Sequence, residues 1–156
     1  MDKLLPGWGV SQLAALFPQV PLADLQPVPD LVRPARPPQP APDATSEPLF
    51  GGLSAFTQLI TWRGVELPVP YRVYFFEPPV AQGQGLTSRQ RQLVYCVYLR
   101  HYDGFVRQRH LEALLKSQQH SPADFAVPFL FSLLGEYVSE ILAVLAQHLP
   151  PGLLRS

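Results

Sequence analysis

The side chains that could transfer protons or bind a metal ion are few and lie in the second half of this chain. His101, Asp103 and His110 fall within one stretch of ten residues, and Glu136 and Glu140 follow at a spacing of four. Carboxylates four apart share one face of a helix, and such a pair can exchange protons or bind a cation when its surroundings separate the two pKa values or supply further ligands. One hypothesis is therefore a small enzyme centred on His101, Asp103 and Glu136.

The same residues also have purely structural explanations. A zinc site needs three or four ligands, usually with short paired spacings, which His101, His110 and the single Cys96 do not supply. His101 would stand near the C-terminus of a helix, where an imidazolium meets the negative end of the helix dipole. The chain contains no phosphate-binding glycine loop, dinucleotide-binding glycine pattern or nucleophile elbow. We therefore predict no catalytic residue, no metal site and no cofactor, and we place the enzyme third among the hypotheses.

Composition narrows the class of protein. With 156 residues, zero formal net charge and 47% hydrophobic residues, the chain fits one globular domain and does not fit a nucleic-acid binder that works through bulk positive charge. The lone Cys96 lies in an apolar run and cannot form an intrachain disulfide, which favours a reducing compartment and a cytoplasmic location. Glu136 and Glu140 interrupt the longest apolar stretch, so we expect no transmembrane span.

Two consecutive helices are predicted after residue 86. The sequence Thr87-Ser88-Arg89-Gln90 matches a capping box, which indicates a helix that starts there and runs to about His101. Asp103-Gly104 then forms a turn, and the apolar spacing that follows predicts a second helix over Phe105–Ser117.

A third helix is expected to be the hydrophobic centre of the domain. Ser121 and Pro122 are typical of a helix start, and Pro128 should break or kink that helix before it continues to Leu149. The segment from Pro128 to Leu149 is apolar around most of its circumference, apart from a narrow stripe that includes Glu136 and Glu140. Such a helix must be buried on several sides, which predicts a small three-helix core.

The turn and the start of the second helix resemble part of a HEAT repeat. Asp103-Gly104-Phe105-Val106-Arg107, followed by Leu111, Ala113 and Leu114, is similar to the opening of the second helix of that repeat. A second copy at a period of about 40 residues, which an array would need, is absent from the sequence. The resemblance implies helix-pair packing and a scaffolding role.

The residues before these helices alternate in polarity. Val65 to Phe76 have the period of a β-strand, and the prolines at 68 and 70 would restrict this segment to an edge strand or an extended arm. Trp62-Arg63-Gly64-Val65 is typical of a turn between two β segments. Residues 53–62 fit either a short helix or a strand, and the pattern does not decide between them.

The first third of the chain is dominated by proline. Eight prolines fall between Pro27 and Pro48, which predicts an extended, disordered tether. We divide the chain into a short docking motif (1–25), a proline-rich linker (26–48), a helical domain with a β arm (49–149) and a tail (150–156). The docking motif contains a short helix between Gly9 and Phe17, with Ser11 as a candidate N-cap. It could bind either the protein's own core or a partner.

The preferred hypothesis is a mostly α, non-enzymatic interaction module: an adaptor, a regulator or an assembly subunit. Its arm would be apolar on both faces, more than a small lone domain can cover, so we expect another protein or a second copy to bind it. The alternative is a nucleic-acid-associated protein that uses a basic helical face. The predicted partner-binding residues are Trp8, Leu13, Leu16, Phe17, Tyr71, Tyr74 and Phe76. The predicted nucleic-acid-binding residues are Arg89, Arg91, Arg100, Arg107 and Arg109.

Overall fold

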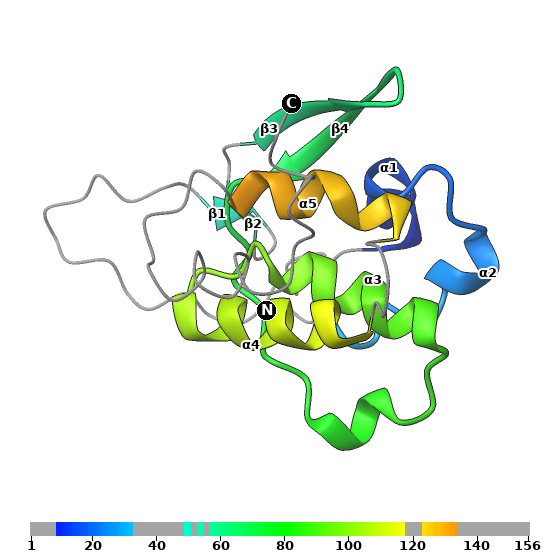
Figure 1. Ribbon diagram of the computed structural model, residues 1–156, viewed down its shortest axis with the longest axis vertical. Coiled ribbons are helices and arrows are strands. Elements are labelled where there is room, and N and C mark those ends of the chain that lie inside the picture. Colours follow the sequence, from blue (N-terminus) through cyan, green and yellow to red (C-terminus); the bar gives the residue numbers. More distant parts are fainter. Residues whose placement is uncertain (1–8, 33–48, 51–52, 55–56, 118–122, 134–156) are drawn as a thin grey trace, which may run out of the picture.

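The computed structural model describes residues 9–32, 49–50, 53–54, 57–117 and 123–133. As predicted, this part of the chain is mostly helical and carries an antiparallel β-hairpin (Figure 1). The helices are α1 (Val10–Leu16), α2 (Leu22–Leu25), α3 (Ser88–Tyr98), α4 (Gly104–Ser117) and α5 (Val127–Ser132), with 3-10 helices at Val80–Gly83 and Asp124–Ala126. The strands are β1 (Leu49–Phe50), β2 (Leu53–Ser54), β3 (Thr57–Trp62) and β4 (Val65–Pro70).

Helices α3 and α4 lie side by side and form the largest helical contact of the described residues (Figure 1). The predicted capping box is confirmed: the Gln90 backbone N–H donates to Thr87 Oγ1 at 3.2 Å, and the Thr87 N–H donates to Gln90 Oε1 at 2.9 Å. Helix α3 ends at Tyr98 instead of the predicted His101. The reason is tertiary, because the Tyr102 N–H leaves the helical pattern and donates to the Val73 carbonyl at 3.0 Å.

Helix α4 begins one residue earlier than predicted, at Gly104. Asp103 caps it, since its carboxylate accepts the Phe105 N–H at 2.9 Å and its carbonyl accepts the Arg107 N–H at 3.1 Å. The inward residues are those predicted from the apolar spacing: Val106, Leu111, Leu114 and Leu115 are buried.

The predicted interruption of the helix near Pro128 agrees with the structure, in which a 3-10 turn, Asp124–Ala126, is followed by the separate helix α5. Helix α5 begins at Val127, and Pro128 occupies its first turn, where a missing N–H costs no hydrogen bond. Phe129, Leu130 and Leu133 are buried, as the predicted apolar face requires. The rest of the expected third helix, including Glu136, Glu140 and the segment to Leu149, lies outside the described residues, as do Ser121 and Pro122.

The ambiguity between helix and strand is resolved in favour of β structure for the described residues 53–54 and 57–62. Strands β3 and β4 pair antiparallel from Thr57 opposite Pro70 to Trp62 opposite Val65. The predicted turn is confirmed, and its two central residues both have positive φ, 51° at Arg63 and 80° at Gly64. Both φ values match a type I′ turn, the two-residue loop whose twist suits a hairpin. In the described residues β4 has β3 as its sole partner, so both prolines of β4 lie on an edge strand, as predicted.

The N-terminal helix docks on the protein's own core. Helix α1 has Gly9 as its N-cap, not Ser11, and the Gly9 N–H donates to Gln12 Oε1 at 2.9 Å. Leu13, Leu16 and Phe17 are almost fully buried, and the Phe17 ring stacks on that of Phe129 at a centroid distance of 5.2 Å. Of the two alternatives for this motif, the structure therefore shows binding to the protein's own core.

The first residues of the predicted linker, 26–32, do not form a linker. Val28, Leu31 and Val32 are buried in the core, so residues 26–32 are part of the folded domain. The physical reason is that prolines 27 and 29 permit tight turns, such as the Leu31 N–H to Val28 carbonyl bond of 3.0 Å, while the apolar residues between and after them turn inward. Residues 33–48 and Trp8 lie outside the described residues.

Candidate functional site

The arm, residues 71–77, follows β4 and keeps the predicted alternation from Val73 to Phe76 but not at Tyr71, which the strand period placed on the same face as Val73. Val73 and Phe75 are buried, whereas Tyr71 and Phe76 are exposed. Its partner is not another strand. The Val73 N–H donates to the Arg100 carbonyl at 2.8 Å, and the only regular pairing is a single parallel bridge between Val73 and His101 in this part of the chain. The strand period of the sequence therefore predicted the buried positions Val73 and Phe75, but it did not predict the groups that hold the arm.

Three side chains at the end of α3 hold the arm, and we call Tyr98, Arg100 and His101 the clamp. The Arg100 side chain is fully buried; its Nε donates to the Pro70 carbonyl at 3.3 Å and its Nη2 to the Tyr71 carbonyl at 2.7 Å. Nη1 also donates to Ser132 Oγ at 3.2 Å, which ties α5 to the arm. A buried guanidinium needs such acceptors, because an unpaired buried charge is strongly unfavourable.

His101 has both ring nitrogens committed to backbone groups. Its Nε2–H donates to the Phe75 carbonyl at 2.8 Å, and its Nδ1 accepts the Asp103 N–H at 3.1 Å. This pattern fixes a neutral tautomer, and burial lowers the pKa of the imidazole further. The Asp103 carboxylate caps α4 by accepting the Phe105 N–H. The pair that suggested proton transfer is therefore engaged in structural bonds, and Glu136 lies outside the described residues.

Tyr98 completes the clamp. Its hydroxyl donates to the Phe76 carbonyl and also lies 3.3 Å from the Leu31 carbonyl, so one buried side chain links the arm to the N-terminal segment. Burial raises the pKa of the Tyr98 phenol well above its usual range. The Tyr98 ring stacks between His101 and His110, at centroid distances of 5.7 and 4.7 Å.

The predicted basic face does not form a single surface. Arg100 is fully buried and Arg107 is 5% exposed, with its Nη1 donating to the His101 carbonyl at 2.6 Å. These two residues cannot meet a nucleic acid in this fold, which corrects their assignment as nucleic-acid-binding residues. The sequence did not distinguish these two arginines from the other three, because the charge pattern does not show that Arg100 and Arg107 bond to buried backbone carbonyls.

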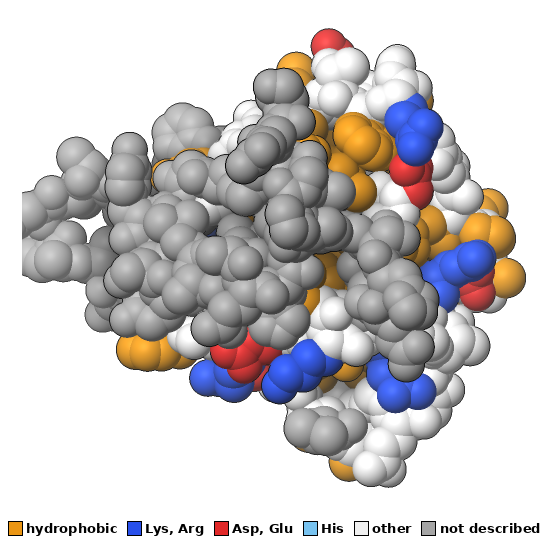
Figure 2. Space-filling model, in the orientation of Figure 1, with side chains coloured by type: hydrophobic (Ala, Val, Ile, Leu, Met, Phe, Trp, Pro, Cys, Tyr) orange, Lys and Arg blue, Asp and Glu red, His pale blue; other side chains and the backbone are white. Residues whose placement is uncertain are grey.

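The remaining three arginines of that set have partners on the surface. Arg89 donates to Asp24 at 3.2 Å, Arg91 to the Leu86 carbonyl at 3.2 Å, and Arg109 forms a bidentate pair with Glu77. Figure 2 shows such blue and red side chains next to one another on the visible face, with hydrophobic side chains between them. The charge of the described helices is thus spread over separate local pairs.

The predicted partner-binding aromatics divide into exposed and stacked residues. Phe76 is 62% exposed and Tyr71 41%, whereas Tyr74 is half-buried and stacks on Tyr102 with ring centroids 5.0 Å apart. Phe105, three residues after Tyr102, is 70% exposed, and sequence analysis missed it. We call Tyr74, Phe76, Tyr102 and Phe105 the aromatic face. Leu13, Leu16 and Phe17 are not available to a partner while α1 stays docked.

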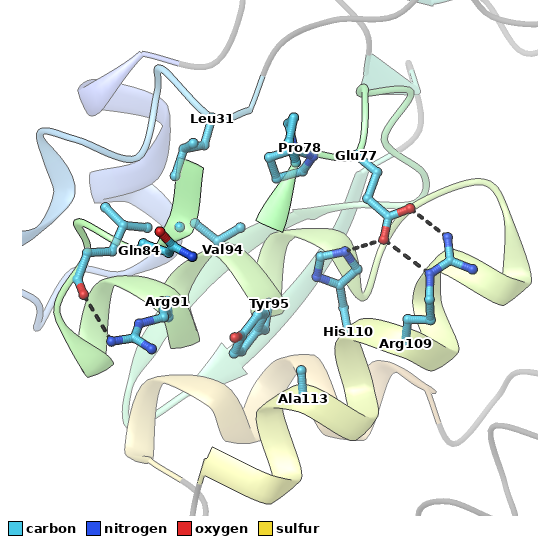
Figure 3. A pocket seen from close by; sticks show the side chains of 13 residues that line it. Leu31, Glu77, Pro78, Gln84, Arg91, Val94, Tyr95, Arg109, His110 and Ala113 are labelled. Carbon is cyan, nitrogen blue, oxygen red and sulfur yellow. Dashed lines mark hydrogen bonds and ion pairs between the residues drawn. The ribbon is translucent and has the colours of Figure 1, made fainter. Parts of the chain in front are cut away.

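A pocket of about 360 Å³ lies at the end of the arm, where Glu77, Pro78 and Pro79 line it (Figure 3). Its walls come from four parts of the chain: the loop after Glu77, the middle of α3, the middle of α4, and Leu31. Most of the lining is apolar, and the polar groups gather at two ends: Glu77, Arg109 and His110 at one, Gln84 and Arg91 at the other. This volume falls within the range of small-molecule sites.

Glu77 organises one end of the pocket. Arg109 Nη2 lies 2.5 Å from Glu77 Oε2, and His110 Nε2 lies 3.2 Å from Glu77 Oε1. The hydrogen bond from Arg109 lowers the pKa of Glu77, so this carboxylate is ionised at neutral pH. Burial lowers the pKa of His110 to about 4, so the imidazole is neutral and donates from Nε2. Glu77 went unnoticed in the sequence because its partners lie more than 30 residues away.

Two kinds of feature, metal-ligand clusters and membrane-spanning helices, are absent from the described residues. These residues hold no group of three or more histidine, cysteine, aspartate or glutamate side chains that could bind a metal ion. None of the helices in this part of the chain is long and apolar enough to cross a membrane. Comparison with known proteins adds no assignment, since no family model, no curated protein and no solved structure matches this chain.

Proposed function

We propose that this protein is a non-enzymatic interaction module, an adaptor, regulator or assembly subunit, that binds another protein through its aromatic face. The observation that carries the proposal is the exposure of Phe76 (62%) on the arm and of Phe105 (70%) at the start of α4, the two segments that the stacked rings of Tyr74 and Tyr102 bring together. Large aromatic side chains that are exposed to water are typical of interaction sites.

The rigidity of this surface supports the same function. The clamp bonds to the carbonyls of Tyr71, Phe75 and Phe76, so the backbone that carries Tyr74 and Phe76 is ordered before a partner binds. A surface that is ordered in advance loses less conformational entropy on binding. Aromatic side chains are also the ones that dominate binding energy at protein interfaces.

The proposal includes two features of the sequence beyond the aromatic face. The proline-rich segment after Val32 acts as a tether, and the third core helix continues from α5 to Leu149. A cytoplasmic location is also proposed, supported by Cys96, a free thiol that is fully buried inside α3. Fractionation of the native host tests the location.

The test compares the native chain with the double variant Phe76→Ser, Phe105→Ser. The matched control is Leu59→Ser, which removes a side chain that is 66% exposed on the hairpin. Size exclusion with light scattering measures self-association, and affinity capture from the native host measures binding of other proteins. We expect a partner or a dimer that is lost in the double variant and retained in the control.

Two outcomes would contradict the proposal. The first is that the native chain is a monomer and captures no other protein, so that the aromatic face has no partner. The second is that a partner binds the double variant as well as the native chain and therefore uses a different surface.

A further inference from the structure

The pocket between the arm's end and the α3–α4 pair has a chemistry of its own, separate from the aromatic face. From its charges and walls, we infer that it binds a small amphipathic anion, a carboxylate with an aliphatic or aromatic body. Nothing in the proposed protein-binding function requires this site.

The walls select an apolar body. Leu31, Pro78, Leu86, Val94 and Ala113 line the pocket, together with the ring of Tyr95 (Figure 3). An apolar group that enters a cavity of about 360 Å³ lined in this way leaves water on most sides, which is the main source of affinity for small ligands.

The end of the pocket at Glu77 is electrically balanced. Glu77 is ionised, Arg109 pairs with both of its oxygens, and His110 is neutral and also bonded to it. The donor groups that face this carboxylate are therefore already used, and this end contributes no net charge. A charged ligand group gains little there.

The opposite end carries an uncompensated positive charge. Arg91 lines the pocket and donates to the neutral Leu86 carbonyl at 3.2 Å, and no carboxylate in the described part of the chain forms an ion pair with it. Gln84, whose amide can also donate a hydrogen bond, lines the same end (Figure 3). The net charge of the pocket is thus +1, which favours a monoanion, and an arginine binds a carboxylate with two parallel hydrogen bonds.

Arg89 shows what distinguishes Arg91. It lies two residues away on the same helix, but it pairs with Asp24 at 3.2 Å and does not line the pocket. The two side chains have the same chemistry and similar exposure, so Arg89 is the natural control.

The test is isothermal titration of the full chain with octanoate, 1-octanol and octylammonium. We expect octanoate to bind at least about tenfold more tightly than 1-octanol, since one charge-assisted contact is worth roughly that factor, and octylammonium to bind weakest. Arg91→Gln should remove the advantage of octanoate over octanol, and Arg89→Gln should keep it. Ala113→Phe fills the pocket and should abolish binding of both, with its urea midpoint as the check on folding.

The inference is overturned by any of three results. The first is that octanoate and octanol bind equally. The second is that octanoate affinity is unchanged in Arg91→Gln, and the third is that the native chain binds none of the three compounds. Binding of octanoate that survives in a folded Ala113→Phe variant would place the carboxylate somewhere else on the molecule and would also refute the site.

Discussion

The hairpin and the arm are consecutive stretches of extended chain that satisfy their backbone groups in different ways. In the hairpin, β3 and β4 pair with each other over six residues, around a turn that local sequence specifies. In the arm, the carbonyls of Tyr71, Phe75 and Phe76 are bonded to side chains of the clamp. The hairpin should therefore tolerate loss of most single side chains, while the arm depends on a few residues far along the chain.

The sharpest test of this comparison is Arg100→Met. Methionine fills a similar volume but leaves the carbonyls of Pro70 and Tyr71 without their charged donor. Each buried carbonyl that loses its donor costs about 1–3 kcal/mol, so we expect a loss of roughly 2–6 kcal/mol of unfolding free energy. Urea unfolding measures the difference.

Arg63→Ala is the control for Arg100→Met. It removes an arginine of the hairpin turn, whose exposed bidentate pair with Asp124 has N–O distances of 2.6 to 2.9 Å. We expect little change in the urea midpoint, because exposed pairs are screened by water. Equal losses in the two variants would show that the arm does not depend on the clamp.

Acid should weaken the arm before the hairpin. His101 and His110 have lowered pKa values in the folded state, to about 4 for His110 against about 6.5 in an unfolded chain. Between these values the unfolded chain binds more protons, so the stability that the neutral imidazoles allow is present above about pH 6.5 and is lost as the pH falls toward 4. For His110 alone the full shift corresponds to roughly 3 kcal/mol.

Urea midpoints at pH 7.5, 6 and 5 measure this loss, and His110→Gln should flatten the dependence on pH. Hydrogen exchange, corrected for the intrinsic effect of pH, should show the Val73 amide losing protection before the hairpin amides. Because His110 Nδ1 has no acceptor in the described structure, its protonation would leave a buried charged N–H unpaired. A stability that is flat from pH 7.5 to 5 contradicts the assignment.

Removal of the Tyr98 hydroxyl is expected to give the next largest loss of stability. Tyr98→Phe removes the hydroxyl that donates to the Phe76 carbonyl, and a buried carbonyl that loses its donor costs about 2 kcal/mol. Tyr95→Phe is the matched control, because Tyr95 lies one turn earlier on α3 and its hydroxyl makes no hydrogen bond in the described part of the chain. If the two variants lose the same stability, the Tyr98 hydroxyl does not hold the arm.

The same contrast explains what could be predicted from the sequence. The capping box at Thr87, the turn at Arg63-Gly64 and the alternation from Val73 to Phe76 are local patterns, and the structure confirms each of them. They could be found because the residues that form the interaction lie within a few positions of one another.

The clamp and the pocket could not be found in this way. Arg100 bonds to carbonyls 29 and 30 residues earlier, and Glu77 meets its partners 32 and 33 residues later. At those separations charge patterning alone cannot tell a buried arginine from an exposed one. It suggested a basic face where the fold has two buried structural arginines, and it gave no sign of the pocket because Leu31, Glu77 and Arg91 share no motif.

The smallest expected effect belongs to the hairpin and is set by backbone geometry. Gly64 has a φ of 80°, which side-chain-bearing residues rarely adopt, although a Cβ built there would meet no atom within 4 Å. Gly64→Ala should therefore cost about 1 kcal/mol through conformation alone, with no clash. Gly85→Ala is the control, since the same open space surrounds it at an ordinary φ, and we expect no loss there. Urea midpoints compare the two, and a hairpin indifferent to Gly64→Ala would mean that its turn, like the arm, is held by contacts made elsewhere in the chain.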